Sequence, residues 1–143
     1  MAVIASMTEA SQAATPSFSQ RRLRVLLIDD DDLVRKAIAT GLRSCNIQVD
    51  DVGSALEGLA LLESNDYDVV ISDLVMSGMD GAGLTRAVKQ IRRTQPVLVL
   101  SGWGAADTFA NIDPEEAPDA IMEKPPRIKK LCNELRRLAG TNT

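Results

Sequence analysis

The sequence predicts an α/β fold in which helices cover both faces of a parallel sheet. Short apolar runs of strand length alternate along the chain with segments whose apolar residues recur at helical spacing. Nearly continuous apolar runs such as Leu23–Asp29 are typical of strands buried on both faces, as they are in parallel sheets. Alternation of strands with helices gives βα units joined by right-handed crossovers. A chain of 143 residues has room for one such domain.

The first half of the folded part predicts two strand–helix pairs. Leu23–Asp29 (LRVLLID) is the first predicted strand, and one of the aspartates that follow it can cap the helix predicted over Leu33–Arg43. Ile47–Val52 predicts a second strand, which is less apolar and is therefore expected near a sheet edge. Ala55–Leu62 carries apolar residues at helical spacing and predicts the next helix.

The second half of the chain continues the same alternation. Tyr67–Asp73 (YDVVISD) and Pro96–Ser101 (PVLVLS) predict strands, and Gly81–Arg93 predicts the helix between them. Ala105–Ala117 contains Asp113-Pro114 and is followed by another proline, so any helix there is expected to be short or broken. The last two predicted elements are the strand Ala120–Glu123 and the helix Ile128–Leu138.

Composition excludes several kinds of chemistry. The chain contains no His, so histidine metal sites and Ser-His-Asp triads are impossible, and it cannot donate a phosphoryl group from a histidine. A net charge of −4 gives no support for DNA binding. No apolar run approaches the ~18 residues that a membrane span needs. Cys45 and Cys132 have no metal-binding spacing and are expected to be reduced thiols in a cytoplasmic protein.

Residues 1–20 differ in composition from the rest of the chain. They carry one charged residue, Glu9, are rich in Ala, Ser and Thr, and show no helical or strand period, so we expect a disordered tail. The basic cluster follows this segment instead of preceding an apolar core, which argues against a secretory signal. Residues 21–143 are then the folded domain. Only five residues follow Leu138, so no output domain is expected.

Polar side chains collect where the predicted strands end. Asp29 and Asp30 end or follow the first strand, Asp73 ends the third, Ser101 ends the fourth, and Lys124 follows the fifth. In an open α/β sheet these carboxyl ends meet at one edge, where ligands bind. Three carboxylates in one place repel one another and need a cation, and an all-oxygen site favours Mg²⁺ or Mn²⁺. A lysine and a hydroxyl beside them suit an anionic ligand such as a phosphoryl group.

Four motifs, in this order and at these intervals, resemble the receiver domain of two-component response regulators, the CheY-like fold. They are LLIDDDDLVRKAI at residues 26–38, VVISDLVMSGMDG at 69–81, PVLVLSG at 96–102 and EKP at 123–125. The resemblance covers about Leu23 to Leu138. It implies a flavodoxin-like (βα)5, doubly wound, five-stranded parallel sheet in the order 2-1-3-4-5, with an irregular region in place of a regular fourth helix.

The resemblance also implies a role for each polar residue. Asp73 matches the phosphoacceptor, which takes a phosphoryl group from a histidine kinase or a histidine phosphotransfer protein. The hydroxyl of Ser101 and the ammonium of Lys124 match the groups that contact the phosphoryl oxygens, and Lys124-Pro125 matches a cis peptide. The chain would then be a relay, a phosphate sink or a regulator that binds a target protein, and not an enzyme with turnover. A receiver cut from a hybrid kinase would have a similar sequence.

The implied cofactor is Mg²⁺, held by the acidic residues. Asp30 would bind the metal directly, whereas Asp29 would act mainly through a bound water. Asp73 would share the same metal, and the backbone carbonyl of Val75 would supply a further ligand. Val75 and Trp103 also match the positions that flank the path of an attacking water, and neither favours such a water. The resemblance therefore predicts slow loss of the phosphoryl group.

The chain departs from the family pattern at three places. Ser77 replaces the usual proline near Asp73, and Ile121 replaces the aromatic residue that often acts as a rotamer switch. The third departure is an acidic segment that carries no basic residue, so its surface is expected to be acidic. Its acidic residues are Asp107, Asp113, Glu115, Glu116 and Asp119.

One alternative of a different class also fits part of the sequence. Residues 30–34 (DDDLV) formally match the DxDx[TV] motif of Mg²⁺-dependent phosphohydrolases of the haloacid dehalogenase type, which use an aspartate nucleophile after a strand. The register is poor, because Asp32 would lie in a loop while Asp29 and Asp30 end the strand. This alternative also gives Asp73 no purpose, and the chain is short for that fold.

Overall fold

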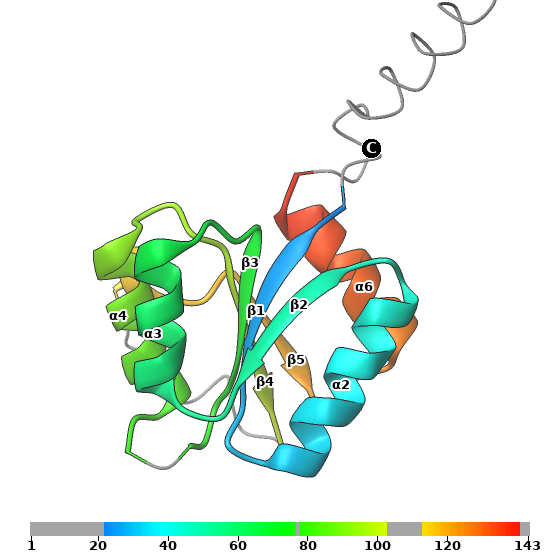
Figure 1. The fold of residues 1–143 in the computed structure, drawn as a ribbon. Coiled ribbons are helices and arrows are strands. Elements are labelled where there is room, and N and C mark those ends of the chain that lie inside the picture. The colour runs from blue at the N-terminus through cyan, green and yellow to red at the C-terminus, as the bar shows by residue number, and fades with distance from the viewer. Residues whose placement is uncertain (1–21, 77, 103–112, 141–143) are drawn as a thin grey trace, which may run out of the picture.

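The computed structural model of the protein describes residues 22–76, 78–102 and 113–140. In this part of the chain five parallel strands form one sheet in the order β2-β1-β3-β4-β5. Figure 1 shows helices α3 and α4 against one face of the sheet and α2 and α6 against the other. The predicted α/β class and strand order are both confirmed.

The elements begin and end close to the predicted residues. The strands are β1 (Arg24–Ile28), β2 (Gln48–Val52), β3 (Val69–Asp73), β4 (Val97–Ser101) and β5 (Ala120–Glu123). The helices are α2 (Asp32–Ser44), α3 (Ala55–Ser64), α4 (Gly81–Ile91) and α6 (Ile128–Leu138), with a short 3-10 helix, η2 (Pro114–Glu116). Differences of one or two residues are those expected at fraying ends of helices and strands.

Polar side chains cap three of the helices where they leave the sheet edge. Asp31 is the N-cap of α2 and accepts hydrogen bonds from the amides of Leu33 and Val34. Ser54 caps α3, and Asp80 caps α4 by accepting from the Gly83 amide at 2.8 Å. These caps satisfy amides that have no partner within the helix, so they fix where each helix begins.

The core consists of two apolar layers, one on each face of the sheet. Side chains alternate along each strand, so Val25 and Leu27 of β1 enter one layer while Leu26 and Ile28 enter the other. The first layer packs against α2 and α6, and the second packs against α3 and α4. This burial on both faces explains why the central strands are continuously apolar.

The second predicted strand lies at a sheet edge, as expected. β2 pairs only with β1 within the described residues, and it carries Asp50 and Asp51 in partly exposed positions. Tyr67 Oη donates to Asp50 Oδ2 at 2.6 Å, so the Asp50 side chain is held against the segment that precedes β3. Polar side chains at this edge discourage pairing with another strand.

The acidic segment before β5 is less acidic at its surface than the sequence predicts. Residues 105–112 lie outside the described residues, as does Ser77, and η2 is the only helical turn described between β4 and β5. Three acidic side chains in and just after η2 pair with basic side chains of α4 and of the residues that follow it. The pairs are Arg86–Glu116 at 3.3 Å, Lys89–Asp119 at 2.7 Å and Arg93–Glu115 at 2.7 Å. These pairs neutralise part of the expected acidic surface, because their basic partners come from a segment distant in the sequence.

The predicted division into a tail, residues 1–20, and a domain, residues 21–143, stays a prediction, since residues 1–21 lie outside the described part. Among the described residues, no helix combines the length and apolar character needed to cross a membrane. Cys45 and Cys132 are free thiols, as predicted.

Candidate functional site

The carboxyl ends of four strands bring the predicted polar residues to one edge of the sheet, the lower edge in Figure 1. Asp29 and Asp30 follow β1, Asp73 ends β3 and Ser101 ends β4. Lys124 follows β5, and its amide donates to the Ser101 carbonyl at 2.8 Å. Parallel pairing alone produces this convergence, because it aligns the ends of neighbouring strands.

Three carboxylates form the centre of the site. One oxygen from each of Asp29, Asp30 and Asp73 lies within 4.8 Å of the others. Asp29 is 1% exposed, and its burial raises the pKa of this carboxyl above the usual value, although hydrogen bonds from the Asp31 amide and from Lys124 oppose the shift. Carboxylates this close repel one another, and their oxygens are the ligands that Mg²⁺ prefers. The donor set therefore fits a hard divalent cation.

Lys124 places a positive charge against two of the three carboxylates. Its Nζ lies 2.9 Å from Asp73 Oδ2 and 3.2 Å from Asp29 Oδ2. Burial of the ammonium lowers its pKa, but the hydrogen bonds and negative charges of Asp73 and Asp29 outweigh burial, so the Lys124 pKa stays above the usual value. The ammonium is thus charged at neutral pH. The peptide between Lys124 and Pro125 is cis, as predicted.

Ser101 presents a buried hydroxyl for which the described part of the chain offers no hydrogen-bond partner. The residue is 1% exposed, and its Oγ makes no hydrogen bond to any of the described residues. A buried hydroxyl without a partner costs free energy, and such groups call for an explanation in a native fold. An oxygen-rich ligand seated at the ends of β3 and β4 would satisfy it, because Asp73 pairs in register with Leu100, next to Ser101.

The segment after β3 begins beside the Asp73 carboxylate. The Val75 amide nitrogen lies 3.5 Å from Asp73 Oδ1, and the Val75 side chain is 75% exposed. A Cβ at Gly81 would lie 2.8 Å from Leu74 Cα and 3.0 Å from the Asp73 carbonyl oxygen. Asp80-Gly81 therefore does more than form the predicted turn, since only glycine allows α4 to begin so close to the Asp73 backbone. Trp103 lies outside the described residues.

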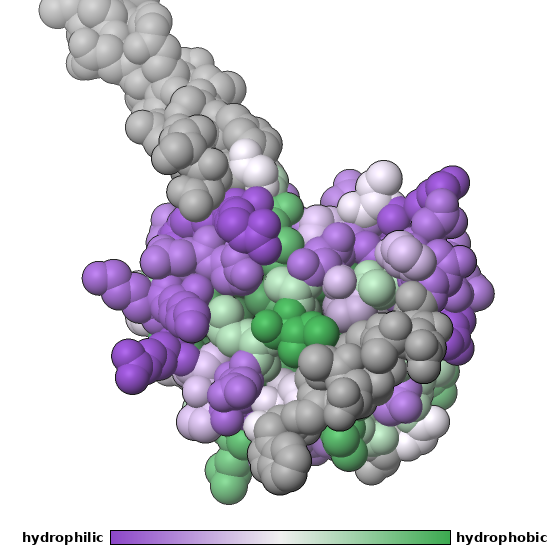
Figure 2. All heavy atoms as spheres, turned by 180° about the vertical axis from the view of Figure 1, so that it is seen from behind, coloured by the Kyte–Doolittle hydropathy of each residue, from purple (hydrophilic) through white to green (hydrophobic). Residues whose placement is uncertain are grey.

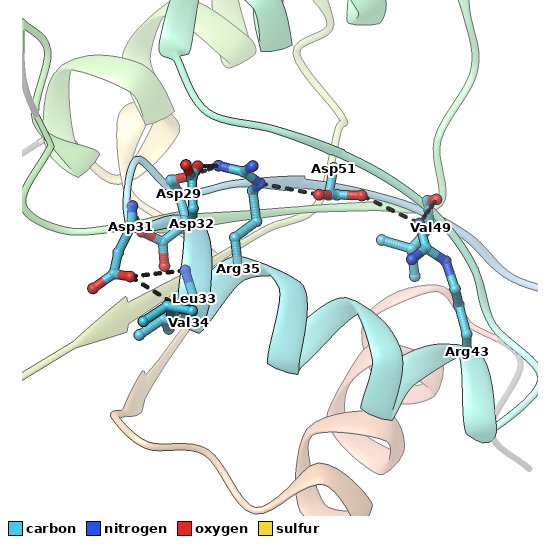
Figure 3. A network of polar contacts seen from close by, with 9 residues as sticks. All are labelled: Asp29, Asp31, Asp32, Leu33, Val34, Arg35, Arg43, Val49 and Asp51. Atoms are coloured by element: carbon cyan, nitrogen blue, oxygen red, sulfur yellow. Dashed lines mark hydrogen bonds and ion pairs between the residues drawn. The ribbon is translucent and has the colours of Figure 1, made fainter.

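The four consecutive aspartates at residues 29–32 take different roles, and Figure 3 labels three of them, Asp29, Asp31 and Asp32. Asp29 and Asp30 join the carboxylate cluster, whereas Asp31 caps α2. Asp32 Oδ1 pairs with Arg35 Nη1 at 2.7 Å. Sequence reasoning missed Arg35, although a basic residue three positions after an aspartate in a helix is a signal for such a pair.

Comparison with known proteins agrees with this geometry. The response regulator receiver domain family matches residues 25–136. Sensor kinase CckA of Brucella abortus (strain 2308) is 34% identical over 119 residues, covering 80% of this chain and 12% of that protein. Two-component response regulator ORR22 of Oryza sativa subsp. indica is 37% identical over 113 residues, covering 78% of this chain and 16% of that protein.

Solved structures show the same fold. The response regulator 1452 receiver domain of Francisella aligns with a TM-score of 0.74 at 25% identity, covering 83% of this chain and 98% of that one. A response regulator receiver domain protein from Clostridium thermocellum aligns with a TM-score of 0.76 at 26% identity, covering 82% and 94%.

The chain belongs to the response regulator receiver domain family. Its fold and its relatives make it a receiver domain of two-component signalling. The comparisons do not support the phosphohydrolase alternative. The chain spans a minor part of the first curated relatives, 12% of the sensor kinase and 39% of the transcriptional regulatory protein QseB of Escherichia coli O157:H7.

Proposed function

We propose that Asp73 accepts a phosphoryl group from the phosphohistidine of a partner histidine kinase or histidine phosphotransfer protein. The observation that carries this proposal is the buried Ser101 hydroxyl at the end of β4, beside Asp73, which has no hydrogen-bond partner among residues 22–76, 78–102 and 113–140. Among the described residues, Lys124 is the ammonium that lies against the Asp73 carboxylate, at 2.9 Å. A hydroxyl and a lysine at the nucleophile are the donors that a phosphoryl group requires.

We infer that the divalent cation of this site is Mg²⁺ and that Asp30 and Asp73 bind it directly. Asp30 is exposed, whereas Asp29 is buried and both of its oxygens already accept hydrogen bonds, from the Asp31 amide and from Lys124. This difference supports an outer role for Asp29, acting through a water. The Val75 carbonyl completes the proposed set of ligands. When bound, Mg²⁺ neutralises charge on the carboxylates and on the phosphoryl oxygens.

In the proposed reaction an Asp73 carboxylate oxygen attacks phosphorus in line with the bond to the histidine nitrogen of the partner. The new O–P bond forms as the P–N bond breaks, and the nitrogen keeps the electron pair. Positioning and charge neutralisation carry most of the catalysis in such transfers. The Lys124 ammonium exchanges its ion pair with the Asp73 carboxylate for one with the phosphoryl oxygens. The Ser101 hydroxyl donates a hydrogen bond to one of these oxygens.

Phosphorylation would alter the surface beyond the site through these two residues. Ser101 ends β4 and Lys124 follows β5, so both are tied to the edge strand on which Ile121 is 42% exposed. Figure 2 shows apolar residues near the middle of the face opposite the view of Figure 1, between hydrophilic surfaces. We propose that an aromatic switch does not operate here, since Ile121 replaces it, and that movement of the Ser101 segment carries the signal to a target protein.

We extend this proposal to the role of the whole protein. We propose a cytoplasmic relay or protein-binding regulator that does not itself bind DNA and that accepts one phosphoryl group for each chain without turnover. Incubation with para-nitrophenyl phosphate and Mg²⁺ should therefore give no sustained release of nitrophenol. Sustained turnover would favour a phosphohydrolase instead.

Titration with beryllofluoride and Mg²⁺, followed by NMR, tests the proposed site. Beryllofluoride mimics the phosphoryl group on an aspartate, so the amide resonances of Ser101 and Lys124 should shift in the wild type. They should not shift in Asp73→Asn, which offers no carboxylate to beryllium. Equal shifts in both proteins would overturn the assignment of Asp73.

A further inference from the structure

Arg35 is a buried cation in contact with the acidic turn, by which we mean residues 29–32 between β1 and the first turn of α2. It lies one turn into α2 and is only 9% exposed, which is uncommon for an arginine. Figure 3 shows its guanidinium between the end of β1, the start of α2 and the end of β2. A buried guanidinium is stable only when its donors are satisfied, so its partners reveal what it holds in place.

The guanidinium binds three acceptors, one from each of these segments. Nη1 donates to the Asp29 carbonyl oxygen at 2.9 Å and pairs with Asp32 Oδ1 at 2.7 Å. Nε donates to Asp51 Oδ2 at 3.0 Å. The rigid, planar fork of arginine can reach all three acceptors at once, whereas the single ammonium of a lysine cannot.

The far end of this network is fixed independently of the acidic turn. Arg43 Nη2 binds Asp51 Oδ1 at 3.2 Å and the Val49 carbonyl oxygen at 2.9 Å. Burial raises the pKa of Asp51, but the hydrogen bonds and charges of Arg35 and Arg43 outweigh it, so the pKa lies below the usual value. The Asp51 carboxylate is therefore held in place by Arg43, and it binds the Arg35 guanidinium from β2.

Two contacts fix the turn that carries the candidate metal ligands. Arg35 holds the Asp29 carbonyl from one side, and the Asp29 carboxylate accepts from the Asp31 amide at 2.9 Å on the other. Asp30 lies between these two contacts in the chain. In addition, Arg35 keeps the Asp32 carboxylate on α2, so Asp32 does not join the cluster formed by Asp29, Asp30 and Asp73.

We propose that Arg35 is a positioning residue that sets the affinity of the acidic cluster for Mg²⁺. It does so by fixing the peptide between Asp29 and Asp30 and by holding Asp32 away from the site. This inference rests on the proposed function, since it assumes that the cluster binds Mg²⁺. Groups that orient metal ligands from outside the first coordination sphere change metal affinity by about tenfold to a hundredfold.

The direction in which Mg²⁺ affinity changes distinguishes a role of Arg35 in positioning ligands from a simple effect of its charge. Removing a cation near three carboxylates would strengthen Mg²⁺ binding through space, because it makes the site more negative. Loss of ligand positioning weakens binding. A role confined to stability would lower the melting temperature and leave the Mg²⁺ dissociation constant unchanged. Arg35→Gln therefore has three distinguishable outcomes.

The test is calorimetric titration of the full chain with MgCl₂, with the melting temperature of each variant measured alongside. The dissociation constant should rise by about tenfold or more in Arg35→Gln. It should rise less, about threefold, in Arg35→Lys, which keeps the charge but not the fork. Arg43→Gln is the matched control, because it removes the other arginine on Asp51 and touches nothing in the acidic turn. Its dissociation constant should stay within about twofold of the wild type.

Unchanged or tighter Mg²⁺ binding in Arg35→Gln, or a loss equal to that of Arg43→Gln, would overturn the positioning role. If Arg35→Gln does not fold, Arg35→Lys decides by the same comparison. Asp30→Asn shows separately whether the titration reports the proposed site. If the wild type does not bind Mg²⁺, or if Asp30→Asn binds it equally well, the proposed function fails and the role of Arg35 fails with it.

Discussion

The ammonium of Lys124 lies 2.9 Å from Asp73 Oδ2, which links the residue after β5 to the end of β3 across the intervening strand β4. The same ammonium reaches Asp29 Oδ2 at 3.2 Å, so it offsets two of the three clustered carboxylates. Lys124 therefore has a structural role before any phosphoryl group arrives.

Replacement of Lys124 should destabilise the protein most strongly in the absence of Mg²⁺. Lys124→Gln leaves the buried Asp29 without its ion pair, and we expect a loss of about 1–2 kcal/mol in the free energy of unfolding, reduced from the fully buried case by the partial exposure of the ammonium. Added Mg²⁺ should raise the melting temperature of this variant more than that of the wild type. Chemical denaturation with and without Mg²⁺ measures both effects, with the exposed Lys129→Gln as control. Equal stability of Lys124→Gln and wild type without metal would contradict this account.

Gly81 should be intolerant of a side chain because of its contact with the Asp73 segment. A Cβ at this position would lie 2.8 Å from a backbone atom, Leu74 Cα, so Gly81→Ala must displace the segment that follows β3. We expect a loss of about 1–3 kcal/mol of stability and slower phosphorylation by acetyl phosphate. Gly83→Ala is the control in the same helix, because its Cβ would meet only side-chain atoms, at 3.3 Å. If Gly81→Ala and Gly83→Ala lose the same amount of stability and are phosphorylated at the same rate, the contact of Gly81 with the Leu74 backbone has no functional consequence.

The phenol of Tyr67 should lose its proton at an unusually high pH in the folded protein. Burial raises the pKa of its phenol to about 12, and the hydrogen bond to Asp50 and the charge of Asp50 act in the same direction. Since the folded pKa lies above the value of 10.0 for a free phenol, Tyr67 contributes stability below pH 10.0 that is lost as the pH rises toward 12. Tyrosinate absorbance measures this directly, because the chain has one Tyr.

Asp50→Asn removes the negative charge beside that phenol. The midpoint of the tyrosinate titration should therefore move down in this variant. A folded wild type that titrates near the free value, or a midpoint that Asp50→Asn leaves in place, would show that the contact between Tyr67 and Asp50 is not formed.

The phosphorylated state should be long-lived because no polar side chain at Val75 orients an attacking water. Val75 is 75% exposed beside the carboxylates, and the double variant Val75→Asn, Trp103→Glu should lose its phosphoryl group about tenfold faster. The decay of phosphorylated protein, followed by intact mass, measures the rate. Leu56→Asn, which changes another exposed apolar residue, should decay like the wild type. Decay of the double variant at or below the wild-type rate would refute the shielding argument.

Much of the site could be predicted from the sequence because parallel strands align their carboxyl ends. Polar residues at the end of each apolar run, such as Asp73 and Ser101, therefore had to meet once the βα alternation was recognised. The order of the strands came from the resemblance, since apolar periodicity does not distinguish which strands are neighbours. The cap at Asp31 followed from the known preference of helix N-termini for aspartate.

Contacts between side chains distant in sequence could not be predicted in the same way. The surface between α4 and η2 was expected to be acidic, yet its carboxylates pair with Arg86, Lys89 and Arg93. The position of Arg35 under the acidic turn depends on Asp51, which reaches it from β2. Such pairs are set by how the helices pack on the sheet, and neither local pattern nor composition reports that packing.

The identity of the phosphoacceptor is the central claim, and intact mass after treatment with acetyl phosphate and Mg²⁺ tests it most directly. Wild type and Asp80→Asn should each gain the mass of one phosphoryl group, because Asp80 caps α4 and takes no part in the transfer. Asp73→Asn should gain none, since its amide is not a nucleophile toward phosphorus. A phosphoryl adduct that persists undiminished in Asp73→Asn would contradict the account.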